Sequence, residues 1–162
     1  SLLGRVFMKP VDCPFRAAEA ELEKRPQDVT VHLFDCHAEA TSDMQLFGRF
    51  LNGKASAVLG THTHVATADE QILDKGTGFQ CDVGMTGPFE SILGRKIDAV
   101  MEATLDAVPT PFQVATADVR LNGTWLDVDS QSGRCLHIER LELREQVIAD
   151  YNAEQSAQRK VL

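Results

Sequence analysis

Apolar and amphipathic segments alternate along the first half of the chain. The run VTVHLFDCH leaves no polar face, which is typical of a strand covered on both sides. The run TSDMQLFGRFLNG instead carries apolar residues at helical spacing. The pattern predicts a helix over 12–25, a strand over 29–37, a helix over 41–53 and a strand over 55–63. This order indicates a β-α-β crossover in a parallel or mixed sheet.

The expected helix starts carry residues that can cap a helix. Asp12 can cap the first helix, and Pro14 suits its first turn. Thr41 or Ser42 can cap the second helix, because their hydroxyls accept hydrogen bonds from free backbone N–H groups.

The pattern changes in the second half of the chain. Its predicted elements are a strand over 78–83, an amphipathic helix over 95–108, an antiparallel meander over 111–143 and a polar tail over 144–162 that could be helical. Asn122 and Gly123 favour a type I′ turn in the meander, and a second turn is expected from Ser130 to Gly133. The whole pattern predicts the α/β class.

Composition narrows the class of protein. The chain has 162 residues, of which 43% are hydrophobic and 25% are charged, as in soluble globular domains. No apolar run approaches the ~20 residues of a membrane helix, so we expect no membrane partner. The net charge of −8 argues against an extended nucleic-acid surface. Cys36 and Cys81 lie in apolar runs, which predicts buried free thiols and a cytoplasmic location.

Three histidines fall where two buried strands are expected to end. His62 and His64 are two residues apart, and residues at that spacing on a strand point to the same side. His37 ends the preceding strand, and the crossover would bring it toward the other two. Because parallel strands place their carboxyl ends at one edge, where open α/β sheets build their sites, three imidazoles could meet there.

This grouping makes a candidate metal site, because neutral imidazole nitrogens ligate metal ions well. The alternative is that each histidine is an ordinary hydrogen-bonded residue. We expect that ordinary role for His32 and His137, which lie within expected strands and have no partner at ligand spacing.

Nearby carboxylates and glycines offer supporting roles. Asp35 could orient a metal-binding histidine as a hydrogen-bond acceptor. Glu39 could do the same, or it could simply begin a helix, where acidic residues are favoured. The segment DVGMTGP predicts either a flexible substrate loop or a plain glycine turn, and its candidate residues are Asp82, Gly84, Met85, Thr86 and Gly87.

Three segments, in this order and at this spacing, resemble a known family. They are FDCHAEATSD, AVLGTHTHVATADEQIL and DVGMTGPFESILG. They resemble the YmdB-type branch of the calcineurin-like metallophosphoesterases, and the likeness covers about Leu3 to Leu143. The resemblance implies part of a four-layer αββα sandwich, with residues 1–143 as the C-terminal portion of the metallophosphoesterase domain and residues 144–162 as a tail.

The resemblance also implies a chemistry. Family members are phosphodiesterases that act on small phosphodiesters, including 2′,3′-cyclic nucleotides, with two divalent metal ions. Iron or manganese is expected, and zinc is possible. By matching positions, His37 and His62 bind one ion and His64 binds the other. The ions would activate a water as hydroxide for attack on phosphorus, and the leaving-group acid stays unassigned.

Family members extend further at the N-terminus, where they supply an Asp, a bridging Glu, an Asn and a His that have no counterpart here. Two divalent ions about 3.5 Å apart repel by ~19 kcal/mol at an effective dielectric constant of about 20. Neutral imidazoles offset none of this repulsion. We therefore expect a C-terminal part of a longer enzyme or a divergent remnant. The missing N-terminal portion or another chain would complete the sheet and the metal centre, and a homo-oligomer is expected.

Two alternatives remain open. One is a non-catalytic regulatory or interaction protein on the same scaffold, which the missing carboxylates would favour in a chain that is naturally short. The other is a mononuclear zinc hydrolase that uses the three histidines and a water.

Overall fold

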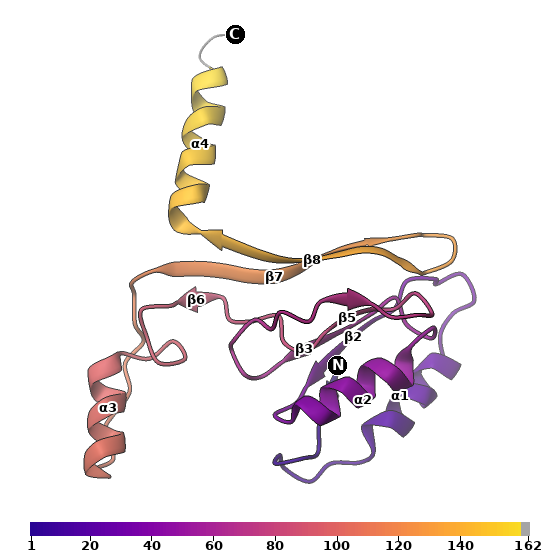
Figure 1. The fold of residues 1–162 in the computed structure, drawn as a ribbon, viewed down its shortest axis with the longest axis horizontal. Coiled ribbons are helices and arrows are strands. Elements are labelled where there is room, and N and C mark those ends of the chain that lie inside the picture. The colour runs from indigo at the N-terminus through magenta and orange to yellow at the C-terminus, as the bar shows by residue number, and fades with distance from the viewer. Residues whose placement is uncertain (160–162) are drawn as a thin grey trace. The chain divides into compact units, whose positions relative to one another are not determined.

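A computed structural model describes the backbone of residues 1–159 and the side chains as far as Asn152. The chain divides into two compact units (Figure 1). The first contains residues 1–84 and 123–140, and the second contains residues 85–122 and 141–162. No helix in the part of the chain that is described is long and apolar enough to cross a bilayer.

A mixed five-stranded sheet forms the centre of the first unit. The strands are ordered β1-β2-β3-β5-β4, and only β4 runs antiparallel to its neighbour. Their bounds are β1 (Leu2–Leu3), β2 (Leu33–His37), β3 (Ala57–Thr61), β4 (Gln71–Ile72) and β5 (Gly78–Gln80). The predicted α/β class, with its mixed sheet, is confirmed, whereas the four-layer sandwich stays a prediction.

Two helices cover one face of this sheet, α1 (Pro14–Glu23) and α2 (Thr41–Leu51) (Figure 1). Phe34 and Cys36 of β2 are buried in the core that the helices share with the sheet. The alternate residues Leu33 and Asp35 are exposed, so the prediction of a strand covered on both faces is wrong for β2 within the described structure. The apolar run is longer than the strand, because Val29 to Val31 precede β2 instead of extending it.

The helices begin without the predicted caps. α1 follows Cys13 and α2 follows Ala40, and neither residue makes a side-chain cap. Asp43, in the first turn of α2, instead accepts hydrogen bonds from the backbone N–H groups of Arg5 (2.8 Å) and Val6 (2.9 Å). This buried carboxylate ties the segment after β1 to the start of α2.

The remaining elements are β6 (Gly87–Pro88), α3 (Ile97–Asp106), β7 (Val119–Val128), β8 (Cys135–Arg144) and α4 (Glu145–Arg159). Strands β6, β7 and β8 form a sheet in that order. The predicted helical tail is present through Arg159, and residues 160–162 lie outside the described residues.

The predicted type I′ turn at Asn122 and Gly123 is wrong, because both residues lie inside β7. The side-chain amide of Asn122 donates to the carbonyl oxygen of Met85 (2.8 Å), and Gly123 lacks the positive φ that such a turn requires. The turn predicted near Ser130 is confirmed. The Gly133 N–H donates to the Asp129 carbonyl (2.8 Å), so one hairpin replaces the predicted meander of residues 111–143.

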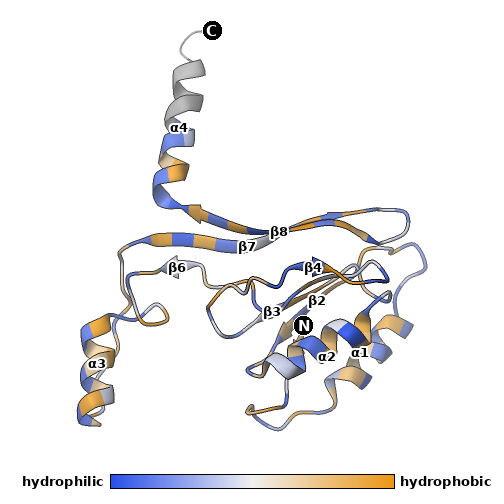
Figure 2. Cartoon of the chain, in the orientation of Figure 1, coloured by the Kyte–Doolittle hydropathy of each residue, from blue (hydrophilic) through white to orange (hydrophobic). Residues whose placement is uncertain are grey.

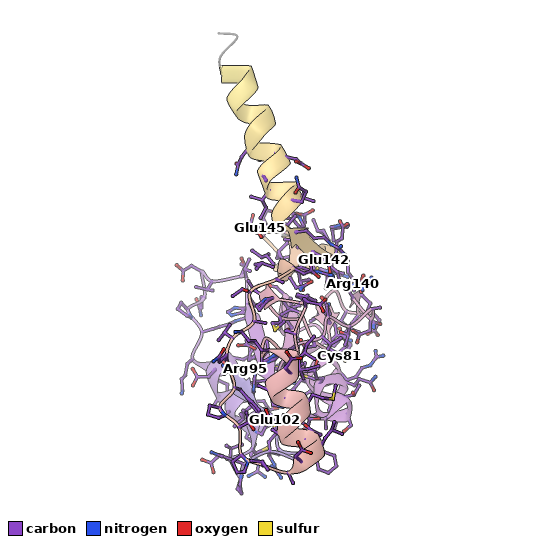
Figure 3. All side chains as sticks on the ribbon, turned by 90° about the vertical axis from the view of Figure 1, so that its left-hand side faces the viewer. Cys81, Arg95, Glu102, Arg140, Glu142 and Glu145 are labelled. Atoms are coloured by element: carbon purple, nitrogen blue, oxygen red, sulfur yellow. The ribbon has the colours of Figure 1, made fainter. Side chains whose placement is uncertain are left out.

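The second unit has an ion-pair cluster at β7 and β8. The Arg120 guanidinium pairs with Asp118, contacts Glu142 (3.2 Å) and lies over the Phe89 ring (4.6 Å). Glu142 lies near Glu145, the first residue of α4 (Figure 3). Within the described structure α3 has no buried residue, so its apolar residues are at least partly exposed (Figure 2).

Candidate metal centre

Two of the three candidate histidines meet at the carboxyl edge of the first unit's sheet. The parallel register places His37 opposite Thr61, so His62 follows directly beside the end of β2. His37 Nε2 and His62 Nδ1 lie 2.9 Å apart, and their ring centroids are 4.7 Å apart in an edge-to-face arrangement. The predicted approach of His37 to His62 is therefore present.

The outer nitrogens of these two rings also have partners. His37 Nδ1 lies 3.0 Å from Thr61 Oγ1, which lies 3.0 Å from Asp35 Oδ1. His62 Nε2 lies 2.8 Å from Glu39 Oε2. The contacts form one continuous chain that begins at Asp35, ends at Glu39 and contains both imidazoles. Asp35 thus reaches His37 through the Thr61 hydroxyl, whereas Glu39 contacts His62 directly.

One hydrogen bond at the start of this series fixes the direction of the next. Thr61 donates to Asp35, so the Thr61 oxygen accepts from His37 Nδ1. Of the two facing nitrogens, His37 Nε2 and His62 Nδ1, one donates to the other, and the tautomers decide which. The contact between His62 Nε2 and Glu39 needs a hydrogen on either group.

The two facing imidazole nitrogens are atoms of the kind that binds a metal cation. His37 Nε2 and His62 Nδ1 are the nitrogens that Thr61 and Glu39 leave free, and outer-shell partners of this kind orient metal-binding histidines. The donor chemistry fits a metal ion. Among the described residues, however, no group of three His, Cys, Asp or Glu side chains converges to hold one. The described residues thus offer two converging ligands.

His64 is exposed, and its side chain makes no hydrogen bond within the described structure. The argument that His62 and His64 share a strand face is wrong, because β3 ends at Thr61. Both histidines lie in the following loop with positive φ, 136° for His62 and 65° for His64. Such backbone conformations cost about 1–3 kcal/mol each and persist only where surrounding contacts impose them.

Asp82 supplies contacts that hold this loop. Its side chain is buried, with 2% of the residue exposed, and Oδ2 accepts hydrogen bonds from the Thr63 N–H (2.7 Å) and the Thr63 hydroxyl (2.9 Å). Oδ1 accepts from the Gly84 N–H (2.8 Å). Asp82 therefore faces the protein interior. Its place in a substrate loop stays a prediction. Its carboxylate accepts hydrogen bonds from the loop of residues 62–67, which carries His62 and His64 and is called the histidine loop below.

Glycine permits the close approach of β3 to the segment after β5. A Cβ atom added at Gly60 would lie 1.6 Å from the carbonyl oxygen of Cys81 and 2.5 Å from Met44 Cε. The Gly60 carbonyl also accepts a hydrogen bond from the Val83 N–H (2.9 Å). The residue two positions before His62 is thus fixed against its neighbour by both shape and hydrogen bonding.

The segment DVGMTGP, residues 82–88, is called the glycine-rich segment below, and it belongs partly to each unit. Gly84 closes a stretch of the first unit, whereas Met85, Thr86 and Gly87 belong to the second. The Met85 carbonyl accepts from the Asn122 side chain, and the Thr86 hydroxyl donates to the Asn122 carbonyl (3.4 Å). Their suggested contact with substrate stays a prediction.

Sequence reasoning missed Thr61 and Thr63. A threonine beside a histidine has no distinctive spacing. Thr61 contacts His37 from the end of β3, and Thr63 contacts Asp82 from the loop that follows. The available signal was the order of residues in GTHTHV, in which each histidine follows a hydroxyl side chain.

The two remaining histidines stay apart from the candidate site, as predicted. His32 Nε2 contacts the Val29 carbonyl oxygen (3.1 Å), and His137 Nε2 contacts the Glu139 carboxylate on β8 (3.3 Å). Both histidines therefore have the ordinary hydrogen-bonding role that the sequence indicated.

Comparison with known proteins places these features in a wider group. A Bacillus subtilis (strain 168) protein named 2′,3′-cyclic-nucleotide 2′-phosphodiesterase is 41% identical over 141 residues, which are 87% of this chain and 53% of that protein. A crystal structure of a hypothetical protein from Thermus thermophilus matches with a TM-score of 0.81 and 43% identity, covering 88% of this chain and 55% of that one.

A crystal structure of a novel phosphatase from Mycoplasma pneumoniae matches with a TM-score of 0.78 and 31% identity, covering 88% of this chain and 51% of that one. The chain spans about half the length of these relatives. The YmdB-like protein family matches residues 1–141, which include β1 to β8 almost entirely and every candidate site residue. The chain therefore belongs to the YmdB-like protein family.

Proposed function

We propose that this chain supplies histidine ligands to a dinuclear metal centre in a phosphodiesterase that hydrolyses 2′,3′-cyclic nucleotides or related phosphodiesters. The observation that carries the proposal is the 2.9 Å contact between His37 Nε2 and His62 Nδ1 at the carboxyl edge of the sheet. The name of the Bacillus subtilis relative supports the substrate class. Iron or manganese is the proposed metal, and His64 is the proposed ligand of the second ion.

Each residue in the series of contacts from Asp35 to Glu39 has a defined part in this proposal. Thr61 holds the Nδ1 side of His37, so the opposite nitrogen is directed toward His62. Glu39 holds the Nε2 side of His62 in the same way. The metal ions, when bound, would supply positive charge to the phosphate oxygens and acidify a water nucleophile. Asp35 would keep the Thr61 hydroxyl oriented, because that hydroxyl donates to its carboxylate.

The remaining ligands and the leaving-group acid are proposed to come from a part of the enzyme equivalent to the rest of the longer relatives, or from another chain. Two converging imidazoles carry no negative charge to offset two divalent ions, so carboxylate ligands are needed in addition. The part of the enzyme that supplies these ligands would also complete the sheet of this chain. The working protein would be a cytoplasmic hydrolase.

A chimera tests this proposal directly. Residues 1–141 of this chain would replace the matching region of the Bacillus subtilis relative. We expect the chimera to hydrolyse 2′,3′-cyclic AMP with added Mn²⁺, and His62→Ala to lower kcat/KM by at least a hundredfold. His137→Ala is the matched control, because His137 lies on β8 and its Nε2 contacts the Glu139 carboxylate, away from His37 and His62. An active His37→Ala, His62→Ala double variant would refute the proposal.

The two alternatives have distinct outcomes in the same experiment. A mononuclear zinc hydrolase would bind one zinc ion and remain active after removal of the second-ion ligands. A non-catalytic interaction protein would bind no metal and give an inactive chimera that still folds. No contact of the described residues favours either alternative over the dinuclear phosphodiesterase.

A further inference from the structure

The carboxylate of Asp82 is buried beside the candidate metal centre, yet the proposed chemistry gives it no task. β5 pairs in parallel with β3, and the Val83 N–H continues this pairing to the Gly60 carbonyl. Asp82 therefore lies beside the point where β3 gives way to the histidine loop. From there its carboxylate reaches Thr63, the residue between His62 and His64.

The carboxylate of Asp82 holds the histidine loop through hydrogen bonds. Three donors surround it, the N–H and hydroxyl of Thr63 and the N–H of Gly84. Among the described residues no lysine or arginine pairs with Asp82, so these three donors are what offset its charge. Hydrogen bonds to an ionised acceptor are roughly twice as strong as those between neutral groups, so the loop is held firmly.

The main chain of Asp82 holds the far end of the same loop. Its N–H donates to Thr67 Oγ1 (2.9 Å), and its carbonyl accepts from the Thr67 N–H (3.0 Å). The loop from His62 to Thr67 is therefore attached to one residue at two points. Gly84 adds a steric limit, because a Cβ atom there would lie 2.9 Å from Ala66 Cβ.

The backbone of the histidine loop needs such an anchor. His62 and His64 both have positive φ, a region that residues with a Cβ rarely occupy. Neither residue is a glycine, so the loop would relax to ordinary φ values without outside contacts. The Thr63 N–H lies between the two strained residues, and its bond to Asp82 is the shortest of the three that the carboxylate accepts.

We propose that Asp82 is a positioning residue, whose carboxylate holds Thr63 and thereby fixes the directions of the His62 and His64 side chains. Through Gly84 the same carboxylate joins the histidine loop to the start of the glycine-rich segment. The effect of Asp82 on metal binding rests on the proposed function, whereas its effect on the loop backbone does not.

Amide hydrogen exchange of the 162-residue chain, followed by NMR without added metal, tests the positioning role. In Asp82→Ala the Thr63 amide should exchange at least tenfold faster, and the Cα and Cβ shifts of His62 and His64 should move. The control is Asp129→Ala, which removes a carboxylate that also accepts a backbone N–H (Gln131, 2.9 Å) and a serine hydroxyl (Ser132, 2.6 Å) in the hairpin turn. That control should leave the Thr63 amide unchanged.

A milder variant keeps the test informative if Asp82→Ala does not fold. Thr63→Val removes the hydroxyl bond to Asp82 (2.9 Å) together with the longer contacts of that hydroxyl to the Val65 main chain (3.3 Å), and it keeps the Thr63 N–H bond to Asp82. It should shift the His62 and His64 resonances, while Thr63→Ser should restore them. Unchanged Thr63 exchange in a folded Asp82→Ala, or unchanged histidine shifts in Thr63→Val, would overturn the proposal.

Metal titration separates this idea from the proposed function. If both hold, Mn²⁺ affinity falls at least tenfold in the chimera that carries Asp82→Ala. Faster Thr63 exchange without any Mn²⁺ binding in the parent chimera would support the positioning role and count against the metal centre.

Discussion

The close approach at Gly60 predicts a large loss of stability for Gly60→Ala. The new methyl carbon would lie 1.6 Å from the Cys81 carbonyl oxygen and 2.5 Å from Met44 Cε, and backbone atoms cannot yield as a flexible side chain can. Separating the two strands also stretches the 2.9 Å hydrogen bond from the Val83 N–H to the Gly60 carbonyl. Overpacking costs about 1–3 kcal/mol and the hydrogen bond about 1 kcal/mol, so the expected loss is about 3 kcal/mol.

Urea unfolding followed by circular dichroism measures this loss. With a slope of about 2 kcal/mol per M, a loss of about 3 kcal/mol lowers the midpoint by about 1.5 M. The matched control is Gly123→Ala, because a Cβ there meets no atom within 4 Å and φ is not positive. We expect the control to change stability by less than about 0.5 kcal/mol. A Gly60→Ala midpoint equal to that of the control would refute the close packing of β3 against the segment after β5.

Three further predictions concern other parts of the first unit. Asp43→Ala removes acceptors for the Arg5 and Val6 N–H groups, so trypsin should cleave after Arg5 faster than in wild type, whereas Asp98→Ala on α3 should leave that rate unchanged. Burial and a hydrogen bond to Asp69 raise the pKa of Cys81 to about 12, while the unfolded thiol titrates near 9.0, so the unfolding free energy should fall between these pH values. Urea unfolding at stepped pH values measures the unfolding free energy of the wild type relative to that of Cys81→Ala. This difference should decline by at most about 1.4 kcal/mol per pH unit, and a difference that stays constant with pH would contradict the buried thiol. Thr61→Val should weaken Mn²⁺ binding by the chimera about 10–100-fold, as expected for loss of a residue that orients a metal ligand, and unchanged calorimetric titrations would count against that role.

The sheet could be predicted largely from the apolar pattern, because strands joined by a single crossover helix tend to be neighbours. That rule brought His37 toward His62, and the parallel register of β2 and β3 confirms it. The strand predicted over residues 29–37 is longer than β2, since Val29 and Val31 are apolar but exposed and lie before Leu33. An apolar residue thus indicates a preference for burial without fixing the point where backbone pairing begins.

The histidine loop could not be predicted from spacing. The two-residue period holds only while a strand continues, and β3 ends before His62. Positive φ at His62 and His64 has no sequence signal of the kind that glycine gives, because it is imposed by contacts from Asp82, a residue some distance along the chain. The Asn122-Gly123 dipeptide shows the converse, since its local preference for a turn is outweighed by the pairing of β7 with its neighbours.

Metal content of the chimera tests the central claim most directly. After reconstitution with Mn²⁺ and removal of free metal, mass spectrometry of the total metal should find about two ions per chain, as in dinuclear sites. The His37→Ala, His62→Ala double variant should hold about one ion or none, while His137→Ala keeps two. Two ions retained in the folded double variant would contradict the assignment of His37 and His62 as metal ligands.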